Sequence, residues 1–290
     1  MIQASLLPEL KHFWNRLRTN NNMKYFIGID IGSTSIKVVI IDEDKKIIAK
    51  GTAATGYHFN ENTEDVLKSL FAEQGITEED IGYIISTGYG RKLYKRSDEN
   101  VNELSANVAG AVSMGNNGVP IRTIINVGGQ DTKVISVSEQ GEMQNFVMND
   151  KCAAGTGKFL EMAAHNLELD ISEFEALHME ARYEPLPVNS TCVVFAESEI
   201  ISLLGAGHKR NEIVSGLHYS IAKRIVRLAA RAKVQDGVLF DGGAALNKGM
   251  VEALETELMR KVYVNEMPQM TTAYGAGVLA IKRWQKVQDA

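Results

Sequence analysis

The spacing of hydrophobic residues along the chain changes repeatedly. Short continuous runs, typical of buried strands, alternate with segments that have the three- and four-residue spacing of helices. Apolar runs rich in Ile and Val, at Tyr25–Ile29 and Thr123–Ile125, are typical of strands. Apolar residues at helical spacing follow each run, at Val66–Phe71 before Gly75 and at Phe159–Leu167. This order of strand and helix patterns predicts an α/β protein.

A repeat inside the chain is its most informative feature. Residues 30–39 align without gaps with residues 126–135, at a constant offset of 96 (126 − 30). Each copy has an apolar strand before it, a tight glycine-containing turn, a β-branched strand after it and a third strand beyond a polar turn. The repeat therefore predicts a three-stranded meander that occurs twice, with helices after each copy.

The glycine-containing turns of the repeat suggest an anion site. Such turns can point backbone N–H groups at an anion, and two that face each other could hold a polyphosphate from both sides. A third glycine turn, Asp241–Ala244, follows the apolar run Val238–Phe240, and its glycines would let the backbone approach a flat ring or a ribose. Other nucleotide motifs are missing, because Lys158 lacks the upstream Gly and the following Ser or Thr of a Walker A loop.

These turns resemble known nucleotide-binding motifs. Asp30–Thr34 resembles the first phosphate motif of the actin, sugar-kinase and heat-shock-chaperone superfamily, Gly128–Asp131 its second, and Phe240–Gly243 its adenosine motif. The resemblance implies two lobes that close on ATP. We expect lobe I over residues 23–121, with a C-terminal helix at about 273–290 returning to it, and lobe II, which carries both cysteines, over residues 122–272.

The two cysteines stand in polar loops rather than on apolar faces. Cys152 precedes an amphipathic helix, and Cys192, 40 residues later (192 − 152), also precedes a helical stretch. Most such cysteines are small buried hydrophobes, but a helix N-terminus favours the thiolate that metals bind. A 4Fe-4S cluster takes four thiolates, so two per chain predict one cluster shared by a homodimer. A zinc site built from the same four thiolates is an alternative.

The cysteine segments resemble the iron–sulfur ATPase activators of 2-hydroxyacyl-CoA dehydratases, relatives of the ATP-binding subunits of benzoyl-CoA reductase. The resemblance runs from about Lys24 to Ile281, is most specific at residues 149–157 and 192–199, and includes the signature Thr87–Arg91. It implies a homodimer with one bridging 4Fe-4S cluster, reduced by ferredoxin or flavodoxin, that hydrolyses ATP and passes single low-potential electrons to an acyl-CoA dehydratase or reductase. Many members have a histidine after the Glu-Leu-Ser stretch at 103–105, where this chain reads Ala106-Asn107, so the partner enzyme stays open.

The resemblances give each candidate residue a role. Asp30 would hold hydrated magnesium, and Gln130 and Asp131 would orient the attacking water or the metal shell, with the choice between them open. The remaining candidates would bind nucleotide: Gly32, Ser33, Thr34, Gly128 and Gly129 at the phosphates, and Gly242, Gly243 and Ala244 at the adenosine. Lys37 and Lys133 recur in the repeat but are interpreted as solvated strand residues.

Length, composition and charge narrow the function classes. A chain of 290 residues has room for two lobes, and its apolar content of 44% argues against disorder. No apolar run approaches the roughly 18 to 20 residues of a membrane span. A net charge of −5, with no Lys/Arg-rich segment, disfavours nucleic acid as a partner.

Two cysteines and no recognisable signal peptide predict a cytoplasmic protein. Residues 1–22 read as an N-terminal extension, with a start at Met23 as the alternative.

A small-molecule kinase, such as a sugar kinase on the same fold, is the main alternative function. Nothing in a sugar kinase requires Cys152 and Cys192 in such loops. A brown, oxygen-sensitive protein that contains iron and sulfide would favour the activator. A colourless monomer that phosphorylates sugars would favour the kinase.

Overall fold

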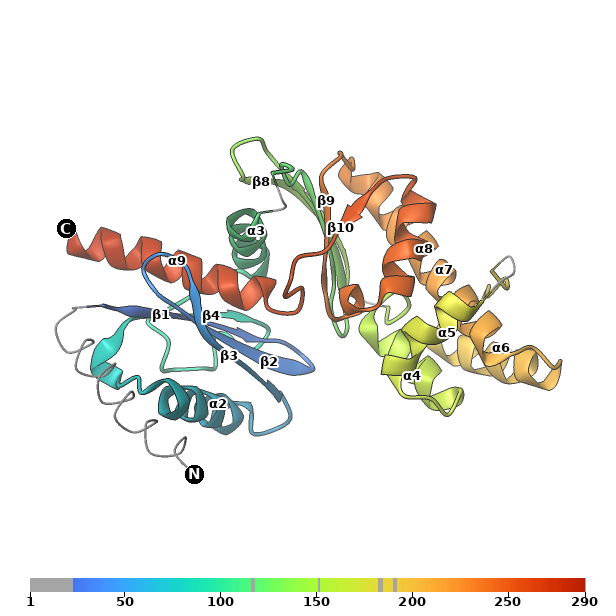
Figure 1. Ribbon diagram of the computed structural model, residues 1–290, viewed down its shortest axis with the longest axis horizontal. Coiled ribbons are helices and arrows are strands. Elements are labelled where there is room, and N and C mark those ends of the chain that lie inside the picture. Colours follow the sequence, from blue (N-terminus) through green and yellow to red (C-terminus); the bar gives the residue numbers. More distant parts are fainter. Residues whose placement is uncertain (1–22, 116–117, 151, 182–184, 190–191, 290) are drawn as a thin grey trace, which may run out of the picture.

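The computed structural model describes residues 23–115, 118–150, 152–181, 185–189 and 192–289, so the extension proposed for residues 1–22 lies outside the described residues. These residues form two five-stranded sheets side by side (Figure 1). The first sheet consists of β1 (Tyr25–Ile31), β2 (Ser35–Ile41), β3 (Ile47–Ala54), β4 (Ile81–Gly88) and β5 (Glu99–Asn100). The second consists of β6 (Thr123–Val127), β7 (Thr132–Val137), β8 (Met143–Asn149), β9 (Val238–Gly242) and β10 (Val262–Tyr263).

The two sheets have the same topology. Their strand orders are β3-β2-β1-β4-β5 and β8-β7-β6-β9-β10, with the first three strands of each antiparallel and the last two parallel to the central strand. The register is also shared, because Asp30 pairs with Lys37 across one hairpin and Asn126 pairs with Lys133 across the other. The structure thus confirms the duplicated meander and extends the duplication to two further strands.

Helices cover both faces of each sheet. On the first sheet, α2 (Phe59–Gln74) packs on the face of Ile27 and Ile29, and α9 (Thr271–Gln288) packs on the opposite face, which holds Phe26 and Ile85. The helix α2 ends at Gly75, whose φ of 65° is a left-handed cap that glycine adopts readily. On the second sheet, α3 (Glu103–Met114) covers the face that points toward the first sheet.

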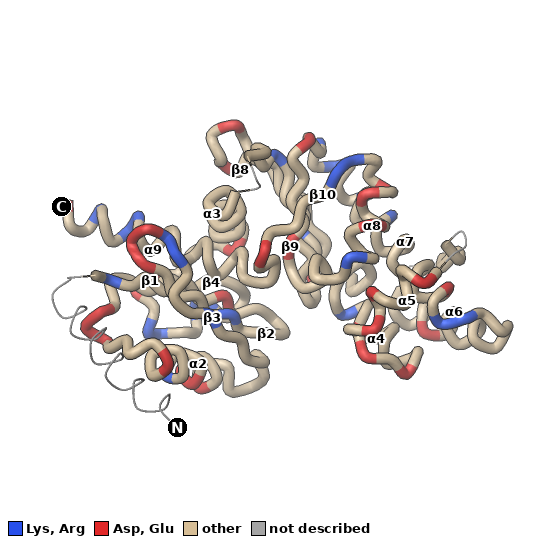
Figure 2. The backbone as a smooth tube through the Cα atoms, in the orientation of Figure 1, with Lys and Arg blue, Asp and Glu red and all other residues tan. Residues whose placement is uncertain are grey.

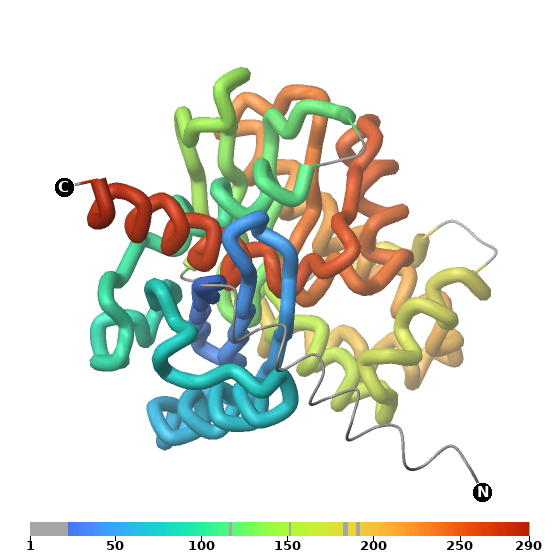
Figure 3. Tube along the Cα trace, turned by 60° about the vertical axis from the view of Figure 1, so that its left-hand side comes forward, coloured from blue at the N-terminus to red at the C-terminus, as the bar shows by residue number. Residues whose placement is uncertain are grey.

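The outer face of the second sheet carries the largest core. It packs against helices α4 (Gly157–Asn166), α5 (Phe174–Glu180), α6 (Val193–Gly205), α7 (Arg210–Ala229) and α8 (Lys248–Leu258). Short 3₁₀ turns occur at Glu78–Asp80, Ile171–Glu173, Ala230–Ala232 and Gly243–Leu246. In two views α6 lies at the end of the molecule opposite α9 (Figures 1 and 3).

The two sheets are joined where α3 crosses α9. A Cβ atom on Gly110 would collide with the carbonyl oxygen of Thr271, and one on Gly275 with that of Ala106. The helices therefore touch through their backbones, and any larger side chain at either glycine would separate them. The division into lobes at residues 121 and 122 stays a prediction.

The surface mixes both signs of charge. Acidic and basic positions are interspersed along the backbone around both sheets (Figure 2). Of the helices in the described part of the chain, none combines the length and the apolar character that crossing a membrane needs.

Candidate active site in the cleft between the sheets

A cavity of about 560 Å³ opens between the two sheets, a size that suits a nucleotide. Residues from both halves of the chain line it. The sequence-predicted residues among them are Asp30, Gly32, Ser33, Thr34, Gly128, Gly129, Asp131, Gly242, Gly243 and Ala244. Gln130 is exposed and does not line the cavity, and neither do Cys152 and Cys192.

The two repeat turns face each other across this cavity. Each is closed by the same hydrogen bond, from Gly32 N to Ser35 O at 3.1 Å and from Gly128 N to Asp131 O at 2.9 Å. A Cβ atom on Gly129 would collide with Thr34 Oγ1, so the tips of the two turns lie against one another. The N–H groups of Gly32 and Gly128 already close their own turns. The residues at the tips of the two turns, such as Thr34 and Gly129, are therefore better placed to donate to phosphate.

Asp30 is placed to serve a metal ion. It is 6% exposed, and its Oδ1 has no hydrogen-bond partner among the described residues. Its Oδ2 has only a long contact of 3.4 Å with Lys37 Nζ. A buried carboxylate oxygen without a partner is costly, and a hydrated magnesium ion would satisfy it. The site therefore fits the predicted metal role.

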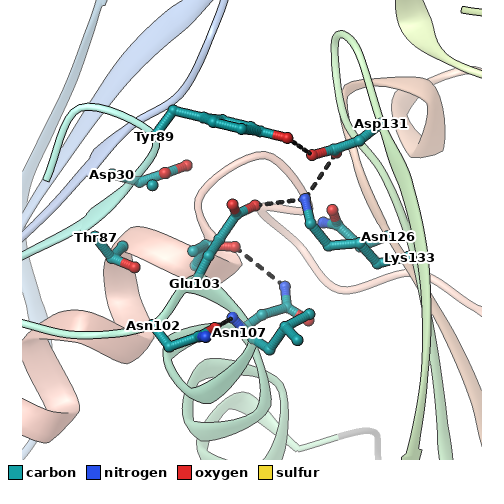
Figure 4. A network of polar contacts seen from close by, with 12 residues as sticks. Asp30, Thr87, Tyr89, Asn102, Glu103, Asn107, Asn126, Asp131 and Lys133 are labelled. Carbon is teal, nitrogen blue, oxygen red and sulfur yellow. Dashed lines mark hydrogen bonds and ion pairs between the residues drawn. The ribbon is translucent and has the colours of Figure 1, made fainter. Parts of the chain in front are cut away.

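Asp131 lies at the centre of a polar network (Figure 4). Lys133 Nζ donates to Asp131 Oδ1 and to Glu103 Oε1, both at 2.7 Å. Tyr89 Oη donates to Asp131 Oδ2 at 2.9 Å from the other side of the cleft. Both oxygens of Asp131 are thus engaged, in contrast to those of Asp30.

The pKa shifts in this network follow from burial and from the excess of carboxylates. Burial alone would lower the pKa of Lys133, but Glu103 and Asp131 outweigh it and raise that pKa above its usual value. Burial raises the pKa of Glu103, as do Asp30 and Asp131, and Lys133 offsets this only in part. Burial and the neighbouring Asp131 raise the pKa of Tyr89 to about 12, so the phenol stays a hydrogen-bond donor at neutral pH.

Three residues of this network were not predicted as site residues. Lys133 was interpreted as solvated, but its side chain is 5% exposed, and its recurrence in the repeat was the signal for it. Tyr89 lies in the signature Thr87–Arg91, which carried no assigned role. Glu103 is the first residue of α3 and lies in the Glu-Leu-Ser stretch at 103–105, to which the sequence analysis assigned no role.

The far end of the cavity suits an adenosine. Gly242 has a φ of 90°, and a Cβ atom there would collide with Val127 O, so the turn after β9 requires glycine. Residues 243–246 form a 3₁₀ turn before α8. Two large apolar side chains, Ile171 and Leu246, are partly exposed and line the cavity, as a flat ring would require.

A buried carboxylate holds this adenosine turn in place. Asp241 is fully buried and accepts hydrogen bonds of 2.7 Å from Asn126 Nδ2 and from Asn107 Nδ2. Burial raises the pKa of Asp241 to about 6, although both amides act against the shift. Asn107, on α3, also contacts Thr272 of α9 at 3.1 Å, so Asp241 joins the second sheet to both crossing helices.

The cysteines lie outside the cavity, and the loop that carries Cys152 adjoins one of the cavity's turns. Cys192 is the N-cap residue of α6, whereas Cys152 stands five residues before the start of α4 (157 − 152) and so is not itself at a helix end. Neither cysteine forms a disulfide, and Cys152 is exposed whereas Cys192 is half-buried. Within the described residues of the single chain, no three His, Cys, Asp or Glu side chains gather as metal ligands.

Three hydrogen bonds tie the Cys152 loop to the second phosphate turn. Gly157 N donates to Gly128 O at 2.9 Å and Lys158 N donates to Gly129 O at 2.8 Å. Thr132 Oγ1 donates to Gly155 O at 2.6 Å. A movement of the turn at the nucleotide phosphates would therefore be transmitted to the cysteine loop.

Comparison with known proteins identifies the family of the chain. A model of the BadF/BadG/BcrA/BcrD ATPase family matches residues 27–280. The chain belongs to this ATPase family. It is 41% identical over 265 residues to the 2-hydroxyisocaproyl-CoA dehydratase activator of Clostridioides difficile, covering 91% of this chain and 97% of the relative. It is also 41% identical over 263 residues to the activator of lactoyl-CoA dehydratase of Anaerotignum propionicum, covering 90% of this chain and 99% of the relative.

Solved structures of the ATPase family and beyond agree with the fold. The activator of the 2-hydroxyisocaproyl-CoA dehydratase from Clostridium difficile, solved with bound ADPNP, has a TM-score of 0.86 at 40% identity and covers 91% of this chain and 97% of its own. A ROK family glucokinase from Streptomyces griseus has a TM-score of 0.56 at 13% identity, covering 89% of this chain and 99% of its own. The second likeness shows the fold alone. The predicted superfold is confirmed, and the relatives favour the activator over a sugar kinase.

Proposed function

We propose that this ATPase-family protein is an ATP-hydrolysing activator that passes single low-potential electrons from a dimer-bridging 4Fe-4S cluster to an acyl-CoA dehydratase or reductase. The observation that carries the proposal is the direct bonding of the Cys152 loop to the second phosphate turn through Gly155, Gly157 and Lys158. These bonds connect the nucleotide cleft directly to the loop that carries Cys152. The relatives are named as activators of different acyl-CoA dehydratases, which leaves the acyl-CoA substrate open.

In the nucleotide cleft, the first turn would hold magnesium and the second the attacking water. Asp30, with its unpaired Oδ1, would bind magnesium through water, and the tip residues Ser33, Thr34 and Gly129 would donate to the phosphates. Asp131 is the better candidate for orienting the water, because it faces the cavity and Gln130 does not. Water then attacks the γ-phosphorus, and ADP leaves.

The cysteines suit a cluster shared by two copies of the chain. Two cysteines per chain, neither of them in a disulfide, supply four thiolates in a homodimer, the number a 4Fe-4S cluster takes. The helix that begins after Cys192 exposes three large apolar side chains, Val194 at 66%, Phe195 at 68% and Ile201 at 59%. An exposed apolar face of this kind is typical of an interface, so a second copy of the chain would cover it. Such a cluster stores and transfers one electron at a time.

Donor, acceptor and location follow from the same function. A low-potential one-electron donor such as ferredoxin or flavodoxin would reduce the cluster, and the acceptor would be an acyl-CoA dehydratase or a related reductase. A cluster of this type would make the protein oxygen-sensitive. The expected location is the cytoplasm.

The first test is the composition of the anaerobically purified protein. We expect a brown dimer with one 4Fe-4S cluster by iron and sulfide analysis. Cys152→Ser and Cys192→Ser should each lose the cluster and weaken the dimer. A zinc-containing dimer, a cluster that survives either substitution, or a colourless monomer with sugar kinase activity would refute the proposal.

The second test is the coupling between nucleotide and cluster. ATP with magnesium should change the rate at which a chelator removes the iron, relative to ADP and to no nucleotide. A tenfold difference in ATP affinity between the oxidised and reduced protein would shift the potential by about 59 mV. Thr132→Val, which removes the bond to Gly155 O, should reduce the nucleotide effect. Its control is Thr123→Val at the other end of the sheet, which removes a partly buried bond of 3.0 Å from Thr123 Oγ1 to Gln235 O and the return bond from Gln235 N. Equal effects of the two variants would contradict the coupling route.

A further inference from the structure

Tyr89 lies at the tip of the turn that follows β4, and the nucleotide roles assigned above do not use it. The turn is fixed to the base of the first phosphate hairpin. Gly90 N donates to Ile31 O at 3.0 Å, and Arg91 Nη1 donates to Gly88 O at 2.8 Å. Gly88 has a φ of 83°, and a Cβ atom there would press on Ile31 O at 2.5 Å. The backbone that carries Tyr89 therefore moves as one piece with the first sheet.

The side chain of Tyr89 reaches away from its own sheet and across the cleft. Its hydroxyl donates to Oδ2 of Asp131, which belongs to the second hairpin, 42 residues farther along the chain. Asp131 is 4% exposed, whereas Tyr89 is 57% exposed because most of its ring spans the cleft (Figure 4). Lys133, from the same sheet as Asp131, holds the other carboxylate oxygen. The carboxylate is thus held by one donor from each half of the molecule.

The duplication shows that this tyrosine is a departure from the repeated backbone. In the first sheet Ile31 pairs with Gly88, and in the second the equivalent Val127 pairs with Gly242. Both glycines have positive φ, so Tyr89 is the structural counterpart of Gly243 in the adenosine turn. At the position where the second half has Gly243, in the turn proposed to bind adenosine, the first half has Tyr89, whose side chain points at Asp131.

We propose that Tyr89 is a positioning residue for ATP hydrolysis: its hydroxyl orients the Asp131 carboxylate from across the cleft, so that this carboxylate is aligned only when the two lobes are closed. With Lys133 alone, the carboxylate keeps one fixed oxygen and can turn about it. The bond from Tyr89 removes that freedom, and phosphoryl transfer depends chiefly on positioning. An opening of the lobes would lengthen the Tyr89–Asp131 bond first, which makes hydrolysis dependent on closure.

The test compares Tyr89→Phe with a matched control, Tyr94→Phe. Tyr94 also donates its hydroxyl to a carboxylate, Glu64 Oε1, but both residues lie within the first half of the chain and neither lines the cavity. We expect Tyr89→Phe to lower kcat for ATP hydrolysis about tenfold while the Kd for ATP changes less than about twofold. Tyr94→Phe should leave both constants unchanged. The full-length, anaerobically purified protein is used, with its iron content measured in each preparation.

A double-mutant cycle separates positioning from a merely structural effect. In an Asp131→Asn background, Tyr89→Phe should have no further effect on single-turnover hydrolysis, because the carboxylate that it orients is gone. An unchanged kcat, a loss of ATP affinity in place of kcat, or additive effects of the two substitutions would overturn the proposal. The proposal uses the role of Asp131 from the proposed function but not the cluster. Failure of electron transfer would therefore show in the cysteine variants and leave these ATPase measurements intact.

Discussion

The two hairpins that face each other across the cleft share a backbone but differ in the side chains at their base. Both turns close with the same hydrogen bond, and both are followed in space by a glycine of positive φ, Gly88 or Gly242. At the base of the first hairpin stand Asp30, Lys37 and Thr87, and at the base of the second stand Asn126, Lys133 and Asp241.

The difference gives the two halves different tasks. The first half leaves Asp30 Oδ1 without a partner, so it is ready for a metal ion. In the second half, protein donors satisfy both carboxylates: Lys133 and, from across the cleft, Tyr89 bind Asp131, and two amides bind Asp241. A duplicated backbone therefore keeps its geometry, while side-chain changes at two of these three equivalent positions suit one half to metal binding and the other to rigid positioning.

The largest expected difference between the hairpins concerns their lysines. Lys133→Met would leave the buried Asp131 and the half-buried Glu103 close together without a cation, so the free energy of unfolding should fall by about 3–5 kcal/mol. Lys37→Met removes a more exposed partner 3.4 Å from Asp30 and should cost less than about 1 kcal/mol. Urea unfolding of both variants measures this. Equal losses of unfolding free energy in the two variants would mean that the bases of the two hairpins are organised in the same way.

The second difference concerns catalysis. Asp131→Asn should lower kcat for ATP hydrolysis by about 10²–10³-fold, because the amide cannot orient the water as the carboxylate does. ATP binding should persist. Its repeat counterpart is Ser35 (131 − 96), and Ser35→Ala should change kcat by less than about threefold. Steady-state hydrolysis and a nucleotide-binding assay check both, and wild-type turnover in Asp131→Asn would contradict the assignment.

The third difference is a pH dependence of protein stability that we expect from the second half alone. The pKa of Asp241 is raised to about 6 in the folded protein, above its ordinary value. Its favourable contribution to stability is therefore fully present below its ordinary pKa and is lost as pH rises through 6. Relative to Asp241→Asn, the wild type should gain up to about 3 kcal/mol between pH 7 and pH 4.

Comparing wild type with variant at each pH removes titrations that the two proteins share. The main one is His218, for which burial and then His178 lower the pKa to about 3, and which acts in the opposite direction. A difference that stays flat with pH would show that Asp241 keeps its ordinary pKa. Thr87→Val, at the equivalent position of the first sheet, should show no such slope.

The smallest expected difference concerns the turn tips. Gly129→Val would place a β-branched side chain against Thr34 and obstruct the approach of phosphate. ATP affinity should fall about tenfold, or about 1.4 kcal/mol. Ser33→Ala, at the repeat counterpart of Gly129 (129 − 96), should weaken it less than about threefold. Equilibrium binding of an ATP analogue distinguishes the two, and equal affinities would contradict the close contact of the tips.

Much of the fold was predictable because its determinants are local. The offset of 96 residues identified both hairpins, since turn glycines and β-branched strands act within a few residues of each other. The two repeat turns contain seven of the predicted residues that line the cavity, and the separate third glycine turn contains the other three, Gly242, Gly243 and Ala244. The repeat did not separate Asp131 from Gln130, because neighbouring residues of a turn point in different directions that only the folded backbone determines.

The network around Asp131 could not be predicted from the sequence, for a different reason. Tyr89 and Glu103 come from elements 42 and 28 residues before Asp131 (131 − 89 and 131 − 103), and nothing local links them. Lys133 lies on a strand whose alternation indicates two faces, but not that α3 would cover one of them.

The sequence by itself thus determined the strands, the turns and the residues able to bind a nucleotide, since each depends on neighbours in the chain. Tertiary structure alone decided which of these residues meet. The close crossing at Gly110 and Gly275 sets the distance between the sheets. That distance brings Tyr89 to Asp131, because hydrogen bonds across a cleft depend on the placement of whole lobes.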